Sequence, residues 1–412
     1  MRKRFINIKK LNGTWPSDKL ILKEKELNEM PCIENAFIDC DNGIITHIGT
    51  MNDMPGEFTG DITDCNFAEV VPAFVDSHTH LVFAATREEE FVDKINGLSY
   101  EAIAAKGGGI LNSANKLAAT PHDVLVVQAL QRLNEIQKQG TATVEIKSGY
   151  GLSLEAELKM LRVIRDLKKL TPLNIKATFL GAHAIPMAYK QDREGYIKLI
   201  INEMLPAVAN ENLADYVDVF CEQGFFSNEE TEQIIIAASK FGLKPKIHAN
   251  QLSNSGAVQT AVKCNAISVD HLEQMDDETI QCLTDSKTIP VVLPTAAFFL
   301  RLPYPPARRM IEAGLPVTLA TDFNPGSSPN GRMSFAISLA CIQMRLTPNE
   351  AINAATLNGA AALELGNKTG SISVGKEASF IILKQDCNIN HIPYFFGKDV
   401  IDKVVVKGIL SN

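Results

Sequence analysis

Two histidines separated by a single residue, His78 and His80, follow an apolar run that starts at Val70. In an extended strand, residues i and i+2 point to the same side, so both imidazoles can reach one metal ion. Taken alone, the pair is equally typical of two half-exposed histidines near a strand end. Polar residues further along the chain favour the metal site.

Most of the apolar runs that follow also end in a residue able to bind a metal or move a proton. His248 comes directly after one such run, and Asp322 after another. Together with the histidine pair they supply three neutral nitrogens and one carboxylate, a set that suits a divalent ion with positions left for water and substrate. The alternatives are a core histidine for His248 and a helix N-cap for Asp322. We expect metal ligation by all four residues.

The central part of the chain alternates short apolar runs with longer helical patterns such as Leu154–Lys168 and Glu229–Phe241. This alternation indicates βα units and a parallel sheet. Eight units predict a closed (β/α)8 TIM-like barrel of class α/β, although periodicity alone also allows an open doubly wound sheet. The barrel is favoured because it brings all the polar strand ends to one face. The predicted strands are Glu69–Phe74, Thr141–Ile146, Ile175–Leu180, Val217–Cys221, Lys244–Ile247, Ala266–Val269, Ile289–Leu293 and Pro316–Ala320.

Both ends of the chain have a different sequence pattern, in which short runs typical of β-strands are separated by turns rich in Asn, Asp, Gly and Pro. We expect the two ends to pair into one small all-β domain. The predicted division is a β-sandwich of residues 1–69 and 368–412, and a barrel of residues 70–367.

Composition narrows the class of partner. The 412 residues carry a net charge of -8 with scattered acidic residues, which argues against a nucleic-acid footprint. No apolar run is long enough to span a bilayer, and the eight cysteines form no CxxC pair. We therefore expect a cytoplasmic protein that acts on a small molecule, with no membrane partner. A homodimer is expected because large βα barrels often pair.

At these residues the sequence resembles the amidohydrolase superfamily, whose pattern is HxH on the first barrel strand, histidines after the fifth and sixth, and aspartate after the eighth. It is most similar to a branch that opens the cyclic amide of 4-imidazolone-5-propanoate to N-formimino-L-glutamate in histidine degradation. The resembling blocks extend nearly end to end and include Val75–Phe83, Val144–Leu152, Phe179–Ala184 and Ala320–Ser327.

The resemblance implies one metal ion per subunit, zinc or iron, held by His78, His80, His248 and Asp322. It places His271 and Asp322 in catalysis, with the choice of principal base left open. It further implies substrate contacts from Arg87, Tyr150, His183, Gln251, Asn324, Gly326 and Ser327.

The residue types are compatible with those roles. The Arg87 guanidinium can hold a propanoate carboxylate through two parallel hydrogen bonds, although a surface pairing with Glu88 to Glu90 is the default for such a charge run. Tyr150 and His183 can bond a polar ring, and each alone is more often structural. The turn from Asn324 to Ser327 offers backbone N–H groups to an anion.

Three alternatives stay open. A nucleobase deaminase would share every metal ligand, but it would have no carboxylate for Arg87 to bind. A barrel that has lost catalysis could serve as an assembly module, against which the four intact ligands speak. Glu222 could bridge a second metal ion, but no lysine at its strand end would form a carbamate, so one ion is favoured.

Overall fold

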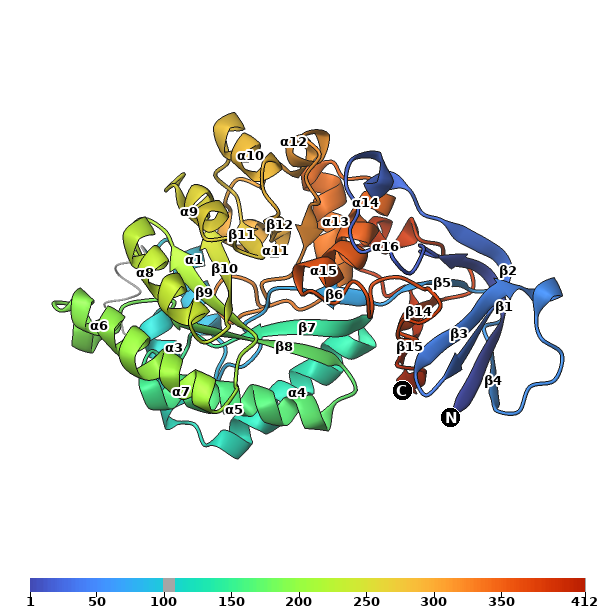
Figure 1. Ribbon diagram of the computed structural model, residues 1–412, viewed down its shortest axis with the longest axis horizontal. Coiled ribbons are helices and arrows are strands. Elements are labelled where there is room, and N and C mark those ends of the chain that lie inside the picture. The colour runs from blue at the N-terminus through green and yellow to red at the C-terminus, as the bar shows by residue number, and fades with distance from the viewer. Residues whose placement is uncertain (99–107, 412) are drawn as a thin grey trace.

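The computed structural model describes residues 1–98 and 108–411 and contains two β-sheets (Figure 1). The larger body, at the left of Figure 1, is an eight-stranded parallel sheet in the order of the chain, curled into a nearly closed barrel with helices around it. The predicted (β/α)8 fold is therefore confirmed. Its strands are β6 (Phe74–Asp76), β7 (Thr141–Lys147), β8 (Asn174–Ala182), β9 (Tyr216–Cys221), β10 (Lys244–Ala249), β11 (Ser268–His271), β12 (Ile289–Val292) and β13 (Thr318–Leu319).

Backbone hydrogen bonds close the barrel between the segments that follow its first and last strands. Asp322 N donates to His78 O at 3.0 Å, and His80 N donates to Phe323 O at 2.9 Å. Thr79 and Phe323 form a parallel bridge at the same place. We call this pairing of residues 78–80 with residues 322–323 the seam. It lies at the carboxyl ends of the strands, the face that carries active sites in this fold.

The helices pack their apolar faces against the barrel wall. In α5, residues spaced three and four apart, Leu158, Leu161 and Leu167 among them, are buried, as an amphipathic helix requires. The helices in the described residues are α1 (Glu88–Ile95), α3 (Ile110–Ala119), α4 (His122–Lys138), α5 (Leu154–Leu170), α6 (Arg193–Leu199), α7 (Leu205–Asn210), α8 (Asn228–Ser239), α9 (Ala257–Lys263), α10 (Asp277–Thr284), α11 (Pro294–Leu300), α12 (Ala307–Glu312), α13 (Met333–Met344), α14 (Pro348–Ala354), α15 (Leu357–Ala362) and α16 (His391–Tyr394). None of these is long and apolar enough to cross a bilayer.

The second sheet joins the two ends of the chain, as predicted, and lies at the right of Figure 1 with both termini. Its order is β16-β15-β14-β5-β1-β2-β3, with β4 pairing β1. Its strands are β1 (Arg2–Asn12), β2 (Cys32–Asp41), β3 (Ile44–Thr50), β4 (Asp61–Asp64), β5 (Glu69–Pro72), β14 (Phe380–Leu383), β15 (Ile401–Val406) and β16 (Ile409–Ser411). The exact division into two domains stays a prediction.

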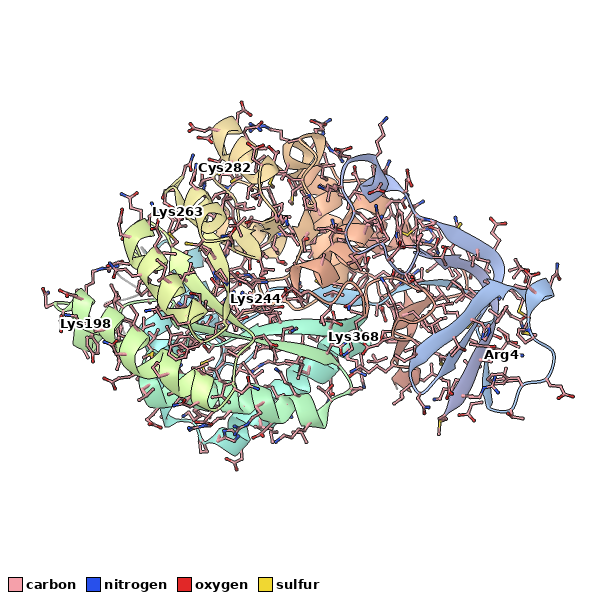
Figure 2. The ribbon with its side chains drawn as sticks, in the orientation of Figure 1. Arg4, Lys198, Lys244, Lys263, Cys282 and Lys368 are labelled. Carbon is pink, nitrogen blue, oxygen red and sulfur yellow. The ribbon has the colours of Figure 1, made fainter. Side chains whose placement is uncertain are left out.

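Two of the residues labelled in Figure 2, Arg4 and Lys244, belong to the two sheets. Arg4 lies within the terminal sheet, where its Nε and Nη2 donate to the two carboxylate oxygens of buried Asp39 at 2.7 and 2.8 Å. Lys244 begins β10, and its ammonium pairs with Glu364.

The first predicted strand was wrong in one respect, because it divides between the two sheets. Glu69–Pro72 pairs with β1 and β14 of the terminal sheet. The chain then leaves that sheet at Ala73, whose N–H still bonds to Ser379 O, and Phe74 N donates to Gly140 O at the start of the barrel. The continuous apolar run therefore divides into β5 of the terminal sheet and β6 of the barrel.

Candidate metal centre and active site

The four predicted metal ligands lie together, with His78, His80 and Asp322 at the seam and His248 near the end of β10. His78 Nε2 and His80 Nε2 are 3.5 and 3.6 Å from Asp322 Oδ1. His248 Nε2 is 3.4 Å from His80 Nε2. The possible ligand atoms of His78, His80 and Asp322 all lie within 4.8 Å of one another, as do those of His78, His248 and His271.

The protonation of this cluster fits a cation. Burial lowers the pKa of both His78 and His80 well below the usual value, so both imidazoles are neutral at pH 7. His78 Nδ1 is 2.6 Å from Asp270 Oδ2, and an ionised carboxylate only accepts, so the proton is on Nδ1. His78 Nε2 then keeps its lone pair, and it has no hydrogen-bond partner among the described residues. The lone pair of His78 Nε2 and Asp322 Oδ1 face each other 3.5 Å apart without a hydrogen bond between them, as two ligands of one ion would.

Three residues of the site have positive φ angles, which are unusual for residues with a side chain. The φ angles of Asp322, His271 and Asn250 are 54°, 90° and 53°. Such conformations cost free energy, about 1–3 kcal/mol each, and are concentrated at functional sites. The turn at each of these strand ends directs its side chain in a way that an ordinary extended residue could not.

A cavity of about 680 Å³ opens above the cluster. All seven residues predicted to contact the substrate line it, together with His80, His248, His271 and Asp322. Its remaining wall was not predicted from the sequence. The wall is formed by Lys94, Ile110, Phe220, Gln223, Gly224, Phe225, Leu252 and Leu300. These residues come from separate helices, strands and loops and carry no common motif, so only the fold reveals that they converge.

Arg87 pairs with an acidic neighbour and also lines the cavity. Its Nε and Nη2 donate to Glu90 Oε2 at 2.9 and 2.6 Å, and Glu90 Oε1 accepts from Gly109 N. The guanidinium also lines the cavity, with Nη1 close to Gly326. Glu90 accepts from two of the five N–H groups of the Arg87 guanidinium, so the opposite edge of the guanidinium can still bind a carboxylate.

Gly326 leaves the space that the Arg87 guanidinium occupies. A Cβ atom at residue 326 would collide with Arg87 Nη1. We expect Gly326→Ala to displace the guanidinium and to raise KM about tenfold or more, with a smaller effect on kcat, because small misplacements of binding groups are costly. Steady-state kinetics check this expectation, with Gly397→Ala as the control, since a Cβ there meets nothing within 4 Å. Equal KM values in the two variants would contradict it.

The turn after Asp322 is organised by the Asn324 side chain. Asn324 Oδ1 accepts from Gly326 N and Ser327 N at 2.7 and 2.8 Å, while Nδ2 donates to Asp322 O and Ser327 Oγ. The backbone N–H groups that were expected to face an anion are therefore used within the turn. Ser327 Oγ is 3.2 Å from Asp322 Oδ2, which places the Ser327 hydroxyl beside the proposed metal ligands.

Tyr150 and His183 lie side by side in the cavity. The Tyr150 loop is held by Glu157, whose carboxylate accepts from Gly149 N, Gly151 N and Leu152 N. His183 Nδ1 lies 3.0 Å from Gly149 O, so it carries a proton and leaves Nε2 as an acceptor. The His183 ring stacks on His80 at 5.2 Å, and burial lowers its pKa to about 3. His183 is thus a neutral side chain beside the cluster.

Glu222, considered as a bridge to a second ion, is engaged elsewhere. Its carboxylate accepts from Gln223 N and Leu252 N at 2.8 and 2.9 Å, and from the Ser253 hydroxyl. These bonds hold the loop that carries Gln251. The geometry gives Glu222 a role in positioning this loop.

His271 has an acidic neighbour. Its Nδ1 is 3.5 Å from Glu273 Oε1. Burial disfavours the charged imidazole, but Glu273 outweighs this effect, and the pKa of His271 is raised above its ordinary value. His271 therefore holds a proton more readily than the neutral His78 and His80.

Sequence analysis missed a group of buried charges beneath the cluster. They are Glu145 and Lys147 on β7, Asp218 on β9 and Lys246 on β10, all fully buried. The available signal was their spacing. Glu145 and Lys147 are two residues apart, as are Lys246 and His248, so each pair faces one side of its strand, here the barrel interior.

The barrel with this histidine and aspartate cluster at its carboxyl face defines an amidohydrolase, a class of metal-dependent hydrolase. In agreement, residues 70–410 match the model of the amidohydrolase family. Imidazolonepropionase of Flavobacterium johnsoniae is 54% identical over 383 residues, which are 93% of each chain. Imidazolonepropionase of Christiangramia forsetii is 51% identical over 405 residues, 98% of each chain. The chain belongs to the imidazolonepropionase family, within the amidohydrolases.

Solved structures of distant relatives share the fold. A triazine hydrolase variant superposes with a TM-score of 0.75 at 15% identity, covering 99% of this chain and 94% of its own. An adenosine deaminase from Xanthomonas campestris, solved with bound zinc, superposes with a TM-score of 0.71 at 15% identity. The match covers 99% of this chain and 92% of the deaminase chain. At such identity the likeness concerns the fold alone. The family and the histidine-rich site together indicate a metal-dependent enzyme that acts on a small molecule.

Proposed function

We propose that this enzyme hydrolyses the cyclic amide of 4-imidazolone-5-propanoate to give N-formimino-L-glutamate. The observation that carries the proposal is one cavity with two chemically different ends. His78, His80 and His248 lie with Asp322 at its base, and the Arg87 guanidinium lies at its side. The first end suits attack on an amide, and the second suits a carboxylate on the same substrate.

His78, His80, His248 and Asp322 would hold the metal ion, zinc or iron. Once bound, such an ion lowers the pKa of a water and polarises a carbonyl oxygen. The protein's part is to keep His78 and His80 neutral, which burial does, and to orient the imidazole of His78, which its hydrogen bond to Asp270 does.

Asp322 and His271 are the groups proposed to move protons. Asp322 lies where the attacking water would be, and it can take a proton and pass it to the leaving ring nitrogen. His271, paired with Glu273, can stabilise the charge that develops on the carbonyl oxygen. The amide C–N bond breaks, the nitrogen gains the proton, and the carbonyl carbon becomes a carboxylate.

Substrate recognition is assigned to the cavity walls. The edge of Arg87 not used by Glu90 binds the propanoate. The proposed polar contacts to the ring and its carboxylate come from Tyr150, His183, Gln251, Asn324, Gly326 and Ser327. The apolar faces of Phe220 and Phe225, whose ring centroids are 4.2 Å apart, form the wall beside them.

A hydrolysis assay tests the proposal. Purified protein is incubated with freshly generated imidazolone propanoate, and in parallel with cytosine, adenine and guanine. We expect the imidazolone ring to open without release of ammonia and the three bases to remain intact. Ammonia release from a base by a protein inactive on the imidazolone would show a deaminase. A protein without stoichiometric metal and without hydrolysis would show an assembly module.

The same proposal includes a cytoplasmic homodimer. Sedimentation of the purified protein at micromolar concentration measures the oligomeric state, and elemental analysis of the same sample distinguishes zinc from iron.

A further inference from the structure

Lys147 is a lysine with no access to solvent, in the barrel interior below the metal cluster. Its ammonium is 2.8 Å from Asp218 Oδ2 and 2.8 Å from Glu145 Oε1, and 3.6 Å from Asp270 Oδ2. A buried cation is tolerated only when it is paired in this way. Burial would lower the pKa of Lys147, but Asp218 and Glu145 outweigh that effect and raise it, so the side chain is charged.

Two of these three carboxylates also contact proposed metal ligands. Asp270 Oδ2 accepts from His78 Nδ1 at 2.6 Å. Asp218 Oδ2 lies 3.0 Å from His248 Nδ1, and Asp218 Oδ1 accepts from His248 N at 3.2 Å. One ammonium therefore lies between two carboxylates that contact imidazoles from different strands.

The second buried lysine has different partners. Lys246 Nζ is 3.1 Å from Glu145 Oε2 and 3.3 Å from Ser77 O. It has the same burial as Lys147 and shares Glu145 with it, but it makes no ion pair with Asp218 or Asp270 within 4 Å among the described residues. The two lysines therefore differ in their direct ion pairs with Asp218 and Asp270, although the charge of Lys246 also acts on the Asp270 carboxylate.

We propose that Lys147 is a positioning residue for the metal centre, which fixes the His78 and His248 imidazoles through Asp270 and Asp218. This inference rests on the proposed ligand set. Removal of a partner that orients a metal-binding histidine typically lowers metal affinity about 10- to 100-fold. The ammonium of Lys147 acts on both orienting carboxylates at once.

The test is the zinc affinity of metal-free protein, measured by competition with a chromophoric chelator. Wild type, Lys147→Met and Lys246→Met are compared, each checked by circular dichroism and thermal unfolding. We expect Lys147→Met to weaken zinc binding about 10- to 100-fold, and Lys246→Met to weaken it several-fold less. If a methionine variant does not fold, the Lys147→Gln and Lys246→Gln pair replaces it, since glutamine keeps one hydrogen-bond donor, and the same order is expected.

Each outcome has a distinct meaning. Equal zinc affinities of the two lysine variants would overturn the role of Lys147, whether both are weakened or neither is. A wild-type protein that binds no zinc or iron would instead contradict the proposed ligand set. A loss confined to thermal stability, with zinc affinity retained, would show that Lys147 serves the fold alone.

Discussion

Replacement of Asp322 by asparagine is expected to lower kcat/KM by about 10²- to 10⁴-fold, the range that general acid–base catalysis contributes. The variant keeps the size of the side chain but removes the negative charge that meets His78 Nε2 and His80 Nε2 at 3.5 and 3.6 Å. It also removes the group proposed to carry the proton to the leaving nitrogen. Metal content should fall as well, which elemental analysis of the purified variant measures.

The matched control for this variant is Asp76→Asn. Asp76 is also buried near the seam, but its two oxygens accept from the backbone N–H and hydroxyl of Thr321 instead of facing the cavity. We expect Asp76→Asn to lower kcat/KM less than tenfold, since it supplies no group to the reaction. Comparable losses in the two variants would contradict a specific role of Asp322.

Replacement of Arg87 by alanine is expected to raise KM about 30- to 100-fold while kcat changes much less. Charge-assisted hydrogen bonds contribute about 1.5–3 kcal/mol each, and 1.4 kcal/mol corresponds to a factor of ten. The effect belongs to KM because the propanoate lies away from the amide that reacts, so its binding is the same before and during the reaction.

An analogue without the carboxylate provides the control. On the corresponding 5-ethyl imidazolone, wild type and Arg87→Ala should have similar kinetic constants, because this analogue has no carboxylate for Arg87 to bind. A variant equally impaired on both compounds would show that Arg87 supports the shape of the cavity through Glu90. An unchanged KM on the natural substrate would contradict the carboxylate assignment.

The placement of the metal cluster follows from local sequence information. The spacing of His78 and His80 and the position of Asp322 after an apolar run are properties of single strands, and parallel strands of a barrel end on one face. The ion pairs of Lys147 with Asp218 and Asp270 could not be predicted, because these partners come from β9 and β11, and sequence periodicity does not say which strands face one another. The sequence pattern indicates which side of its strand a residue faces. Only the closed barrel shows which residues of other strands it contacts.

Two further differences show where one sequence is ambiguous. The run from Glu69 to Phe74 reads as one strand, but it crosses between two sheets at Ala73 because the terminal strands pair over long distances. Arg87 was expected to be either a surface ion-pair partner or a substrate ligand. It pairs with Glu90 and lines the cavity at once, because a guanidinium has two usable edges.

The seam links closure of the barrel to the proposed ion site. His78, His80 and Asp322 contribute their side chains to the proposed ion site and their backbone groups to the closing hydrogen bonds. An ion bound there would join the first and last βα units like a crosslink between distant parts of the chain. With such an ion, metal binding and barrel closure would be coupled equilibria, and each would stabilise the other.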